Sequence, residues 1–333
     1  MKRATLLAFP LLLAGALPLA AQPKLLVNAQ MDNRSAAGGL ESQFKALLTT
    51  QPQPAWIGYS VPSARGYNLG CDYVRDGFNQ PGVVHLEPPD HAVILFRIES
   101  NTVNRIRTLS PDCEIDAGNV PVHWLSDVQP AQSVALLISL MPQRDRIGES
   151  PLAAIAQHSD PAAEQALERF LGTDQPESVR LRVVSWMGSS RGRQGFEVLK
   201  KLIASDPNEK VRERAISALS NSREPEALDL LISTARSDTN PRMREQAISA
   251  LGRKPSPQVV TLLSKVVESD PDNQVKRRAV SALNQLPDGQ GIPVLIQVVK
   301  TTQNAELRKQ AMSTLGQSRD PRALAFFEEV LKR

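Results

Sequence analysis

Few features of this sequence carry recognisable chemistry. Aromatic residues make up only 4% of the 333 residues, and the chain has two cysteines and four histidines. It contains no glycine-rich phosphate loop, no GxSxG, no HExxH and no pair of carboxylates with catalytic spacing. These absences argue against the enzyme classes that such motifs mark, and we expect neither a cofactor nor a bound metal.

Charge of one sign is not in large excess either. The formal net charge is +4 at neutral pH, which is too small to indicate a nucleic-acid partner. The hydrophobic content of 41% and the charged content of 22% are those of a globular protein. Scarce aromatic residues beside many Ala, Leu, Val and Ser favour packed layers of helices over an aromatic-rich β core.

The first 21 residues have the order of a secretory signal peptide. Lys2 and Arg3 precede the apolar run LLAFPLLLAGALPLAA, which ends in small residues. Pro10 and Pro18 interrupt the run, which argues against a permanent membrane anchor, and no later segment is apolar enough to cross a bilayer. We therefore expect cleavage after Ala21 and a mature chain, with no membrane span, that is periplasmic or secreted.

The two cysteines, Cys71 and Cys113, fall in the same half of the chain. In an oxidising compartment such a pair is best explained as one disulfide. A catalytic Cys113 with His123 is the competing interpretation, but no sequence typical of a nucleophilic cysteine surrounds it. A metal site built on His85, His91 and His123 is a further alternative, and their spacing matches no strong metal-binding rule.

Residues 22–148 show no long-range period and predict a small α+β domain. Short apolar runs at 55–61, 82–87, 93–98 and 103–109 are typical of strands, with ESNT as a hairpin loop between the last two. The segments 38–50 and 130–141 read as helices. The boundary to the next region falls within 142–151.

From residue 150 to 333 the sequence repeats with a period of 32 residues. The first apolar position of each repeat's second helix is Val179, Val211, Met243, Val275 and Leu307. Apolar or small residues follow four, five and eight positions later, which places one stripe on a 3.6-residue helix. A further helix precedes each of these, and residues 321–333 form a last helix without a successor. We expect about five helix pairs and a terminal cap helix, stacked because no pair can bury its stripe alone.

Glycine follows the last apolar position of the second helix in three of the repeats. These residues are Gly188, Gly252 and Gly316. The position predicts a left-handed C-terminal cap that turns the chain back.

Period and pattern resemble HEAT repeats over residues 161–333, specifically the short type of bacterial scaffold proteins and of phycobilisome-lyase-like proteins. In HEAT repeats an Asp ends the turn between the two helices, an Arg six residues later begins the second helix, and the two kinds of residue pair between adjacent units. The matching pairs here are Asp174 and Arg180, Asp206 and Arg212, Asp238 and Arg244, and Asp270 and Lys276. Thr302 replaces Asp in the last unit, where Arg308 is kept. We interpret this set, the ladder, as structural. A lyase function finds no support beyond the repeats.

Long polar side chains recur two residues after each ladder cation. They are Arg182, Arg214, Gln246, Arg278 and Gln310. Solenoids of this class bind partners on the concave face formed by the second helices, and a row of Arg and Gln there suits an acidic protein segment. The alternative is a solvated helix face with ordinary i,i+4 pairs.

The sequence thus predicts an exported, non-catalytic scaffold or adaptor that binds another protein through an α-solenoid. The alternative is a hydrolase or metal-dependent enzyme in residues 22–148, with the solenoid selecting its substrate.

Overall fold

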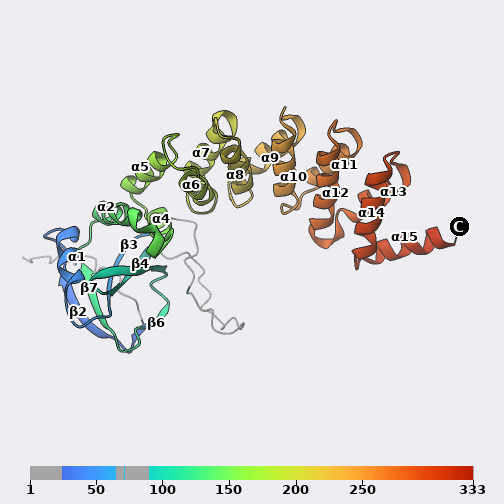
Figure 1. The fold of residues 1–333 in the computed structure, drawn as a ribbon. Helices are drawn as coiled ribbons and strands as arrows, with labels where there is room; N and C mark the ends of the chain where they lie inside the picture. The colour runs from blue at the N-terminus through green and yellow to red at the C-terminus, as the bar shows by residue number, and fades with distance from the viewer. Residues whose placement is uncertain (1–24, 65–70, 72–89, 333) are drawn as a thin grey trace, which may run out of the picture.

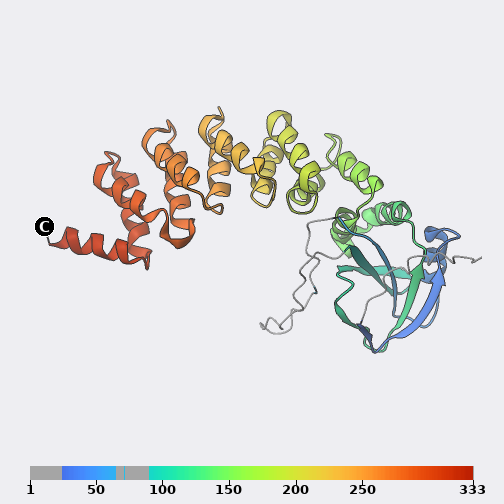
Figure 2. The ribbon, with the colours of Figure 1, turned by 180° about the vertical axis from the view of Figure 1, so that it is seen from behind.

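The computed structural model describes residues 25–64, 71 and 90–332 of the chain. A small sheet with flanking helices is followed by a row of helix pairs that bends into an arch (Figure 1). Seen from behind, the same arch runs from the sheet to the C-terminal helix at its far end (Figure 2). The prediction of an α-solenoid preceded by a small α+β domain is confirmed.

The main sheet has five strands in the order β2-β7-β3-β4-β5. Strands β3 (Ala55–Pro62), β4 (His91–Glu99) and β5 (Thr102–Leu109) are antiparallel neighbours, whereas β7 (Pro121–Ser126) lies parallel between β2 (Gln30–Ser35) and β3. Two short parallel strands, β1 (Leu25–Val27) and β6 (Glu114–Asp116), form a separate pair.

Helices α1 (Leu40–Leu48) and α2 (Pro130–Leu140) share a core with one face of the main sheet. The aromatic rings of Phe44 and Phe96 meet edge to face at 5.0 Å between centroids, and Tyr59 lies 5.5 Å from Phe96. Three of the five aromatic residues that the structure describes before the solenoid therefore belong to this one core. The opposite face carries a smaller cluster of Val93, Leu95 and Trp124.

A short 3-10 turn η1 (Met141–Gln143) and helix α3 (Arg144–Ile147) connect α2 to α4 (Ser150–Gln157). Helix α4 packs on α2 and also contacts β5, α5 and α6. These two helices are arranged like the later helix pairs, with α2 in the place of a first helix and α4 in that of a second. The hydrophobic core consequently runs without a break from the sheet into the solenoid.

Five helix pairs and one unpaired helix follow. The pairs are α5 (Pro161–Phe170) with α6 (Glu177–Ser190), α7 (Gly192–Ser205) with α8 (Glu209–Leu219), α9 (Glu226–Ser237) with α10 (Pro241–Leu251), α11 (Pro257–Ser269) with α12 (Asn273–Gln285), and α13 (Ile292–Thr301) with α14 (Ala305–Gln317). A 3-10 turn η2 (Pro287–Gly289) precedes α13, and α15 (Pro321–Leu331) is the last helix. The even-numbered helices α6 to α14, here called the inner helices, line the inner side of the arch (Figure 1). The odd-numbered helices from α5 on are the outer helices.

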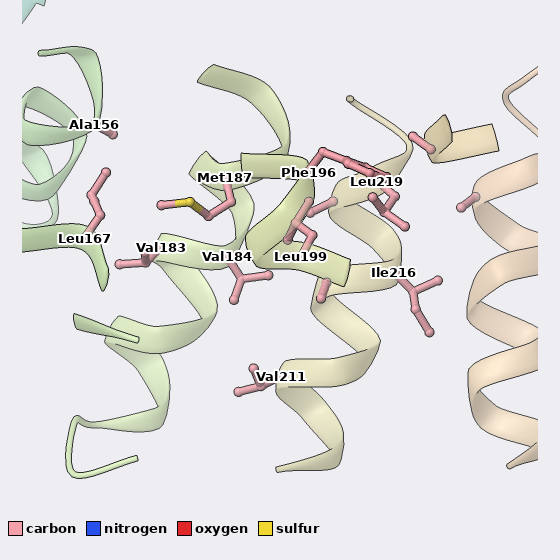
Figure 3. Close-up of a cluster of buried hydrophobic side chains, with 14 of the residues drawn as sticks. Ala156, Leu167, Val183, Val184, Met187, Phe196, Leu199, Val211, Ile216 and Leu219 are labelled. Atoms are coloured by element: carbon pink, nitrogen blue, oxygen red, sulfur yellow. The ribbon is translucent and has the colours of Figure 1, made fainter. Parts of the chain in front are cut away.

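The apolar stripe of each inner helix forms the core between neighbouring pairs. Val183 and Val184 of α6 and Ile216 of α8 are fully buried. In Figure 3 Val184 lies between α6 and α8, near Leu199 of α7, whereas Val183 points toward the preceding helices, where Leu167 lies, and Ile216 points toward the following inner helix. Small residues at the same positions, such as Ala215 and Ala247, are also fully buried and let adjacent helices approach closely.

The glycines that follow the stripe do not form left-handed caps, so that prediction is wrong. Gly252 has a right-handed φ of −59°, and Gly188 lies inside α6. A Cβ on Gly188 would stand 2.2 Å from the carbonyl oxygen of Ala218 in the next inner helix, and one on Gly252 would stand 3.2 Å from Cα of Ala282. Glycine is needed here for close helix contact rather than for a left-handed turn.

The strands predicted at 55–61, 93–98 and 103–109 and the helices predicted at 38–50 and 130–141 correspond to β3, β4, β5, α1 and α2. The strand predicted at 82–87 lies outside the described residues. Strands β2 and β7 were not predicted, because β2 is largely exposed and polar and β7 begins with proline. Within the described residues, no helix has both the length and the apolar composition needed to cross a bilayer.

Candidate functional site

Two ion pairs of the ladder connect the side chains of adjacent repeats directly. Arg244 of α10 donates from Nε and Nη2 to the two carboxylate oxygens of Asp270, at 2.8 and 2.9 Å, and both side chains are nearly buried. Arg180 of α6 forms the equivalent buried ion pair with Asp206 and also donates to the carbonyl of Leu171. The Asp270 carboxylate raises the pKa of Arg244. Each of these arginines therefore reaches the aspartate of the following repeat.

The other ladder cations contact backbone oxygens of their own repeat. Arg212 donates to the carbonyl of Asp206, Arg308 donates to that of Thr302, and Lys276 donates to that of Glu268 at 3.1 Å. Asp174 of the first repeat is exposed and accepts from Gln175. Pairing between repeats thus occurs at alternate steps of the ladder.

In the inner helices α8, α10, α12 and α14 the capping side chain is not that of the ladder residue but that of the residue two positions later. Asn208 accepts hydrogen bonds from the amides of Lys210 and Val211. The ladder residue Asp206 instead accepts from the amide of Asn208 at 2.9 Å and so shapes the turn before the cap. The remaining caps of this kind are Asn240, Asp272 and Asn304.

The capping asparagines have a second function that sequence reasoning missed. The side-chain amide of Asn208 donates to Glu177 at 2.9 Å, and that of Asn240 donates to Glu209 at 2.9 Å. Hydrogen bonds from Asn208 and Lys210 lower the pKa of Glu177. One asparagine therefore caps its own helix with its oxygen and binds the preceding inner helix with its nitrogen. Asn304 also does so, through Asn273.

A second row of contacts lies in the loops that follow the inner helices. Arg191 donates to the carbonyl of His158 at 2.7 Å, Lys254 donates to that of Ser222 at 3.2 Å, and Arg322 donates to that of Gly289 at 2.9 Å. Each donor lies 32 or 33 residues after its acceptor. Both ends of the inner helices are therefore joined from repeat to repeat.

The three arginines of the predicted partner-binding row lie at the surface of inner helices. Arg182, Arg214 and Arg278 are exposed. Among the described residues, Arg182 and Arg214 have no carboxylate within salt-bridge distance, and Arg278 reaches Glu245 only at 4.0 Å. These three guanidinium groups are available to a ligand.

The two glutamines of the same row contact the preceding inner helix. The side-chain nitrogen of Gln310 donates to the carbonyl of Arg277 at 3.1 Å and to the hydroxyl of Ser281 at 3.2 Å. The side-chain oxygen of Gln246 lies 3.4 Å from the hydroxyl of Ser217. Gln246 and Gln310 thus contribute to the packing of repeats.

A buried chain of hydrogen bonds joins the sheet to the first helices. The Tyr59 hydroxyl lies 2.7 Å from Ser133 Oγ in α2, which in turn lies 2.8 Å from His158 Nε2. His158 Nδ1 lies 2.8 Å from the carbonyl of Ala154, an acceptor only, so it carries the proton and Nε2 accepts from Ser133. Burial lowers the pKa of His158 to about 4. Neutral His158 therefore completes this chain, with Tyr59 donating to Ser133.

The residues considered for chemistry in the first domain have other partners. Cys71 and Cys113 form a disulfide, so Cys113 is not a free thiol. His91 Nδ1 contacts Asp90 and His123 Nδ1 contacts Asp32, each at 2.9 Å. His85 lies outside the described residues, and the part of the chain that the structure describes holds no cluster of potential metal ligands.

An apolar cavity of about 260 Å³ lies on the sheet face opposite α1 and α2. Its walls include Trp56, Leu95 and Ile115, with Arg105 and Arg107 among the polar residues. The disulfide also borders it. The sequence did not predict this cavity, because the residues that line it come from strands far apart in the chain.

Comparison with known families identifies the repeats. The profile of HEAT repeats matches residues 152–220, 196–284 and 260–333. The chain belongs to the HEAT-repeat family. The first match begins within α4, in agreement with the place of α4 as a second helix in front of the first full pair.

Two solved structures are similar to parts of this HEAT-repeat chain. One is a chain of the CpcE–CpcF complex of phycocyanin lyase from Nostoc sp. PCC7120, with 23% identity, a TM-score of 0.36, and coverage of 46% of this chain and 99% of that chain. The other is human deoxyhypusine hydroxylase in complex with glycerol, with 18% identity, a TM-score of 0.27, and coverage of 61% and 74%. No curated protein matched the sequence.

These comparisons correct one prediction. We expected from the absence of catalytic motifs, and from the pairing of the two cysteines, that the chain is not an enzyme. A similar chain belongs to a phycocyanin lyase, so a repeat architecture of this kind does not support the exclusion of catalysis, and we withdraw it.

Proposed function

We propose that this HEAT-repeat protein is an exported interaction module that binds an acidic segment of another protein on the surface of its inner helices. The observation that carries the proposal is the row of Arg182, Arg214 and Arg278, exposed on α6, α8 and α12, in which only Arg278 has a described carboxylate within salt-bridge distance, Glu245 at 4.0 Å. Planar guanidinium groups spaced along a repeat surface suit carboxylates, which they bind through paired, charge-assisted hydrogen bonds.

The charge around this row supports the same partner chemistry. Lys309 of α14 is exposed, and the Arg277 side chain of α12 donates to the neutral side chain of Gln274. Glu213 and Glu245 lie next to the row on α8 and α10, so the excess of positive charge is greatest at α12 and α14. An acidic segment would therefore gain most from the C-terminal half of the face.

Charge reversal tests the proposal. The triple variant Arg182→Glu, Arg214→Glu and Arg278→Glu should bind a fluorescein-labelled oligoglutamate peptide more weakly than the unchanged chain, by about tenfold or more. A hydrogen bond to a charged group contributes about 1.5–3 kcal/mol, so the loss of even one such bond gives this change in affinity. Fluorescence anisotropy at several salt concentrations measures both the affinity and its salt dependence.

A matched control distinguishes binding at the inner-helix surface from an effect of net charge on affinity. Lys201→Glu, Arg236→Glu and Lys265→Glu make the same change on exposed positions of outer helices and should leave affinity within about twofold after allowance for long-range screening. Equal losses in the two triple variants would show that net charge, and not the inner-helix surface, governs binding.

Export is the second part of the proposal. The charged and apolar order of residues 1–21 supports it, and the Cys71–Cys113 disulfide is of the kind that persists in oxidising compartments. Expression in a bacterium, followed by fractionation and N-terminal sequencing, should give a periplasmic or secreted chain that begins at Gln22. The change Leu11→Arg with Leu12→Arg should retain the chain in the cytoplasm. An unprocessed N-terminus on the unchanged chain would contradict export.

A further inference from the structure

We propose that the apolar cavity of the first domain binds a small amphipathic carboxylate, whose apolar body lies against the main sheet and whose charged group meets Arg97 and Arg105. This site is separate from the inner-helix arginines, so the proposal does not depend on the function proposed above.

The cavity lies between the main sheet and the short strand pair of β1 and β6. Both sides contribute apolar side chains, which are Trp56 of β3, Leu95 of β4, Val122 of β7, Leu26 of β1 and Ile115 of β6. At about 30 Å³ for each non-hydrogen atom, which is the share of one water molecule in the liquid, the volume of about 260 Å³ holds roughly nine such atoms. This space suits a short fatty acid or a molecule of similar size, and it is too small for a nucleotide or a folded peptide.

The strand register arranges the side chains of this sheet face in rows that change from apolar to cationic. In the first row each residue is the register partner of the next, in the order Val122, Trp56, Arg97 and Arg105. In the second row Leu95 of β4 is the partner of Arg107 of β5. A ligand that lies along these rows therefore has apolar side chains against one end and guanidinium groups at the other.

Arg97 and Arg105 lie directly opposite each other on neighbouring strands. Like charges at opposed positions destabilise a sheet. The Arg97 guanidinium lies 5.5 Å from the centroid of the Trp56 ring, and no carboxylate of the described residues lies within salt-bridge distance of either arginine. A bound anion would relieve the repulsion between the two guanidinium groups.

The carboxylates near the cavity are engaged within the protein. Asp116 accepts one hydrogen bond from a side-chain amide at 3.0 Å and one from a backbone amide at 2.8 Å. Glu99, at the end of β4, accepts from a neighbouring side-chain amide at 3.3 Å. Glu114 and Arg107, both in the cavity wall, each have an interaction as well. Of the described charged groups on this face, the two opposed arginines are therefore the ones left for a ligand, and their sign selects an anion.

The shape of the anion follows from the guanidinium group and from the volume. A planar carboxylate accepts two parallel hydrogen bonds from one guanidinium fork. It also takes little of the space, so most of the cavity remains for an apolar body that contacts Trp56 and Leu95.

Octanoate is the probe, because its apolar chain fits the cavity while its carboxylate projects toward the exposed Arg105. Labelled with ¹³C at the carboxyl carbon, it is titrated with the full chain and followed by NMR. We expect saturable binding with a Kd of about 1 mM or lower. Absence of saturation at concentrations about tenfold above that value would contradict the proposal.

Two double variants test the arginines. Arg97→Gln with Arg105→Gln should bind octanoate at least about tenfold more weakly, because charge-assisted hydrogen bonds are lost. The same variant should unfold at an unchanged or higher temperature, because the repulsion between β4 and β5 is removed. The matched control, Arg146→Gln with Arg223→Gln, removes equal charge from exposed positions elsewhere and should bind within about twofold. Equal weakening in both double variants would show that net charge governs binding and would refute the site.

A third variant and two further ligands test the apolar part. Leu26→Trp fills the cavity and should abolish octanoate binding with unchanged circular dichroism, whereas retained binding would place the ligand elsewhere and overturn the proposal. Octan-1-ol lacks the charge and acetate lacks the apolar chain, so each should bind at least about tenfold more weakly than octanoate. Octan-1-ol that binds as tightly would mean an apolar site without charge selection, and acetate that binds as tightly would mean an adventitious anion only. Either result overturns the proposal.

Discussion

The two ends of the solenoid differ in how their apolar faces are covered. At the N-terminal end, α2 and α4 form a helix pair whose far side is buried against the sheet, and Tyr59, Ser133 and His158 continue the contact with hydrogen bonds. At the C-terminal end, α15 leaves Leu324 and Leu331 in solvent. At one end of the described solenoid the core therefore continues into a domain of different fold, while at the other end apolar side chains of the last described helix are exposed. The first end is stabilised by the sheet, whereas apolar side chains of α15 are exposed at the second.

The largest effect is expected from damage to the covered end. Leu137 of α2 is fully buried in the core shared by sheet and solenoid. Leu137→Ala should lower the free energy of unfolding by about 2–5 kcal/mol, because it removes buried methyl groups and leaves a cavity. Urea unfolding followed by circular dichroism measures the change. A cost below 1 kcal/mol would show that the sheet does not cover this end.

The second-largest loss of stability is expected when an ion pair in the middle of the solenoid is broken. Arg244→Met leaves the buried carboxylate of Asp270 without its bidentate partner, and we expect a loss of about 3 kcal/mol. Arg212→Met, which removes a bond to a backbone carbonyl only, should cost less than about 1 kcal/mol.

Adding Asp270→Asn to Arg244→Met provides the control. Asparagine keeps an oxygen for the amide of Asp272 but carries no charge, so the double variant should recover part of the loss. If the double variant is as unstable as the single one, the buried charge is not the cause.

The junction between sheet and solenoid should weaken in acid. The pKa of His158 is lowered to about 4 in the folded protein, against an ordinary value of about 6.5 in the unfolded chain. Between these values the unfolded chain binds the extra proton, so His158 adds stability fully above pH 6.5 and loses it as the pH falls toward 4. Its contribution should change by about 1.4 kcal/mol per pH unit in this window. His158→Gln should unfold with a shallower dependence on pH; identical slopes would contradict the assignment.

A smaller effect is expected from a single helix cap. Asn208→Ala removes the cap of α8 and the bond to Glu177, and should cost about 1 kcal/mol. Asn208→Asp keeps the capping oxygen but loses the amide that reaches Glu177, so thermal unfolding should place it between the alanine variant and the unchanged chain.

The smallest effect is expected at the open end. Leu331→Ser should change the free energy of unfolding by no more than about 0.5 kcal/mol, because the side chain is 85% exposed. Chemical unfolding of this variant beside Leu137→Ala compares the two ends directly. A loss as large as that of Leu137→Ala would mean that Leu331 is already covered in solution.

The solenoid was predictable because its core positions recur at one spacing. Val211, Met243 and Val275 mark the same place in successive repeats, and a stripe repeated in register has few explanations besides stacked helix pairs. The sequence did not predict that α2 and α4 form a helix pair, because η1 and α3 lie between them and replace the short turn of the later pairs. In the sheet, β7 enters between β2 and β3, and nothing in a single sequence marks which strands become neighbours.

The candidate site was predictable only in part. Exposed positions of Arg182, Arg214 and Arg278 follow from helical periodicity, but the bonds of Gln246 and Gln310 to the preceding helix depend on how two helices stack. The contacts of Arg191 and Lys254 were missed for a related reason. Their acceptors are backbone carbonyls, which every residue has and which leave no mark in the sequence.

The close approach at Gly188 and Gly252 has a geometric consequence for the whole arch. These two glycines bring α6 against α8 and α10 against α12 at one end of the inner helices, while Ser220 and Asn284 hold the same position in the other two steps. The residue at this position therefore limits how closely two successive inner helices approach. A methyl group at Gly188 would meet the backbone of Ala218 and push α6 and α8 apart at this end, whereas one at Gly252 would require only a small shift of α12.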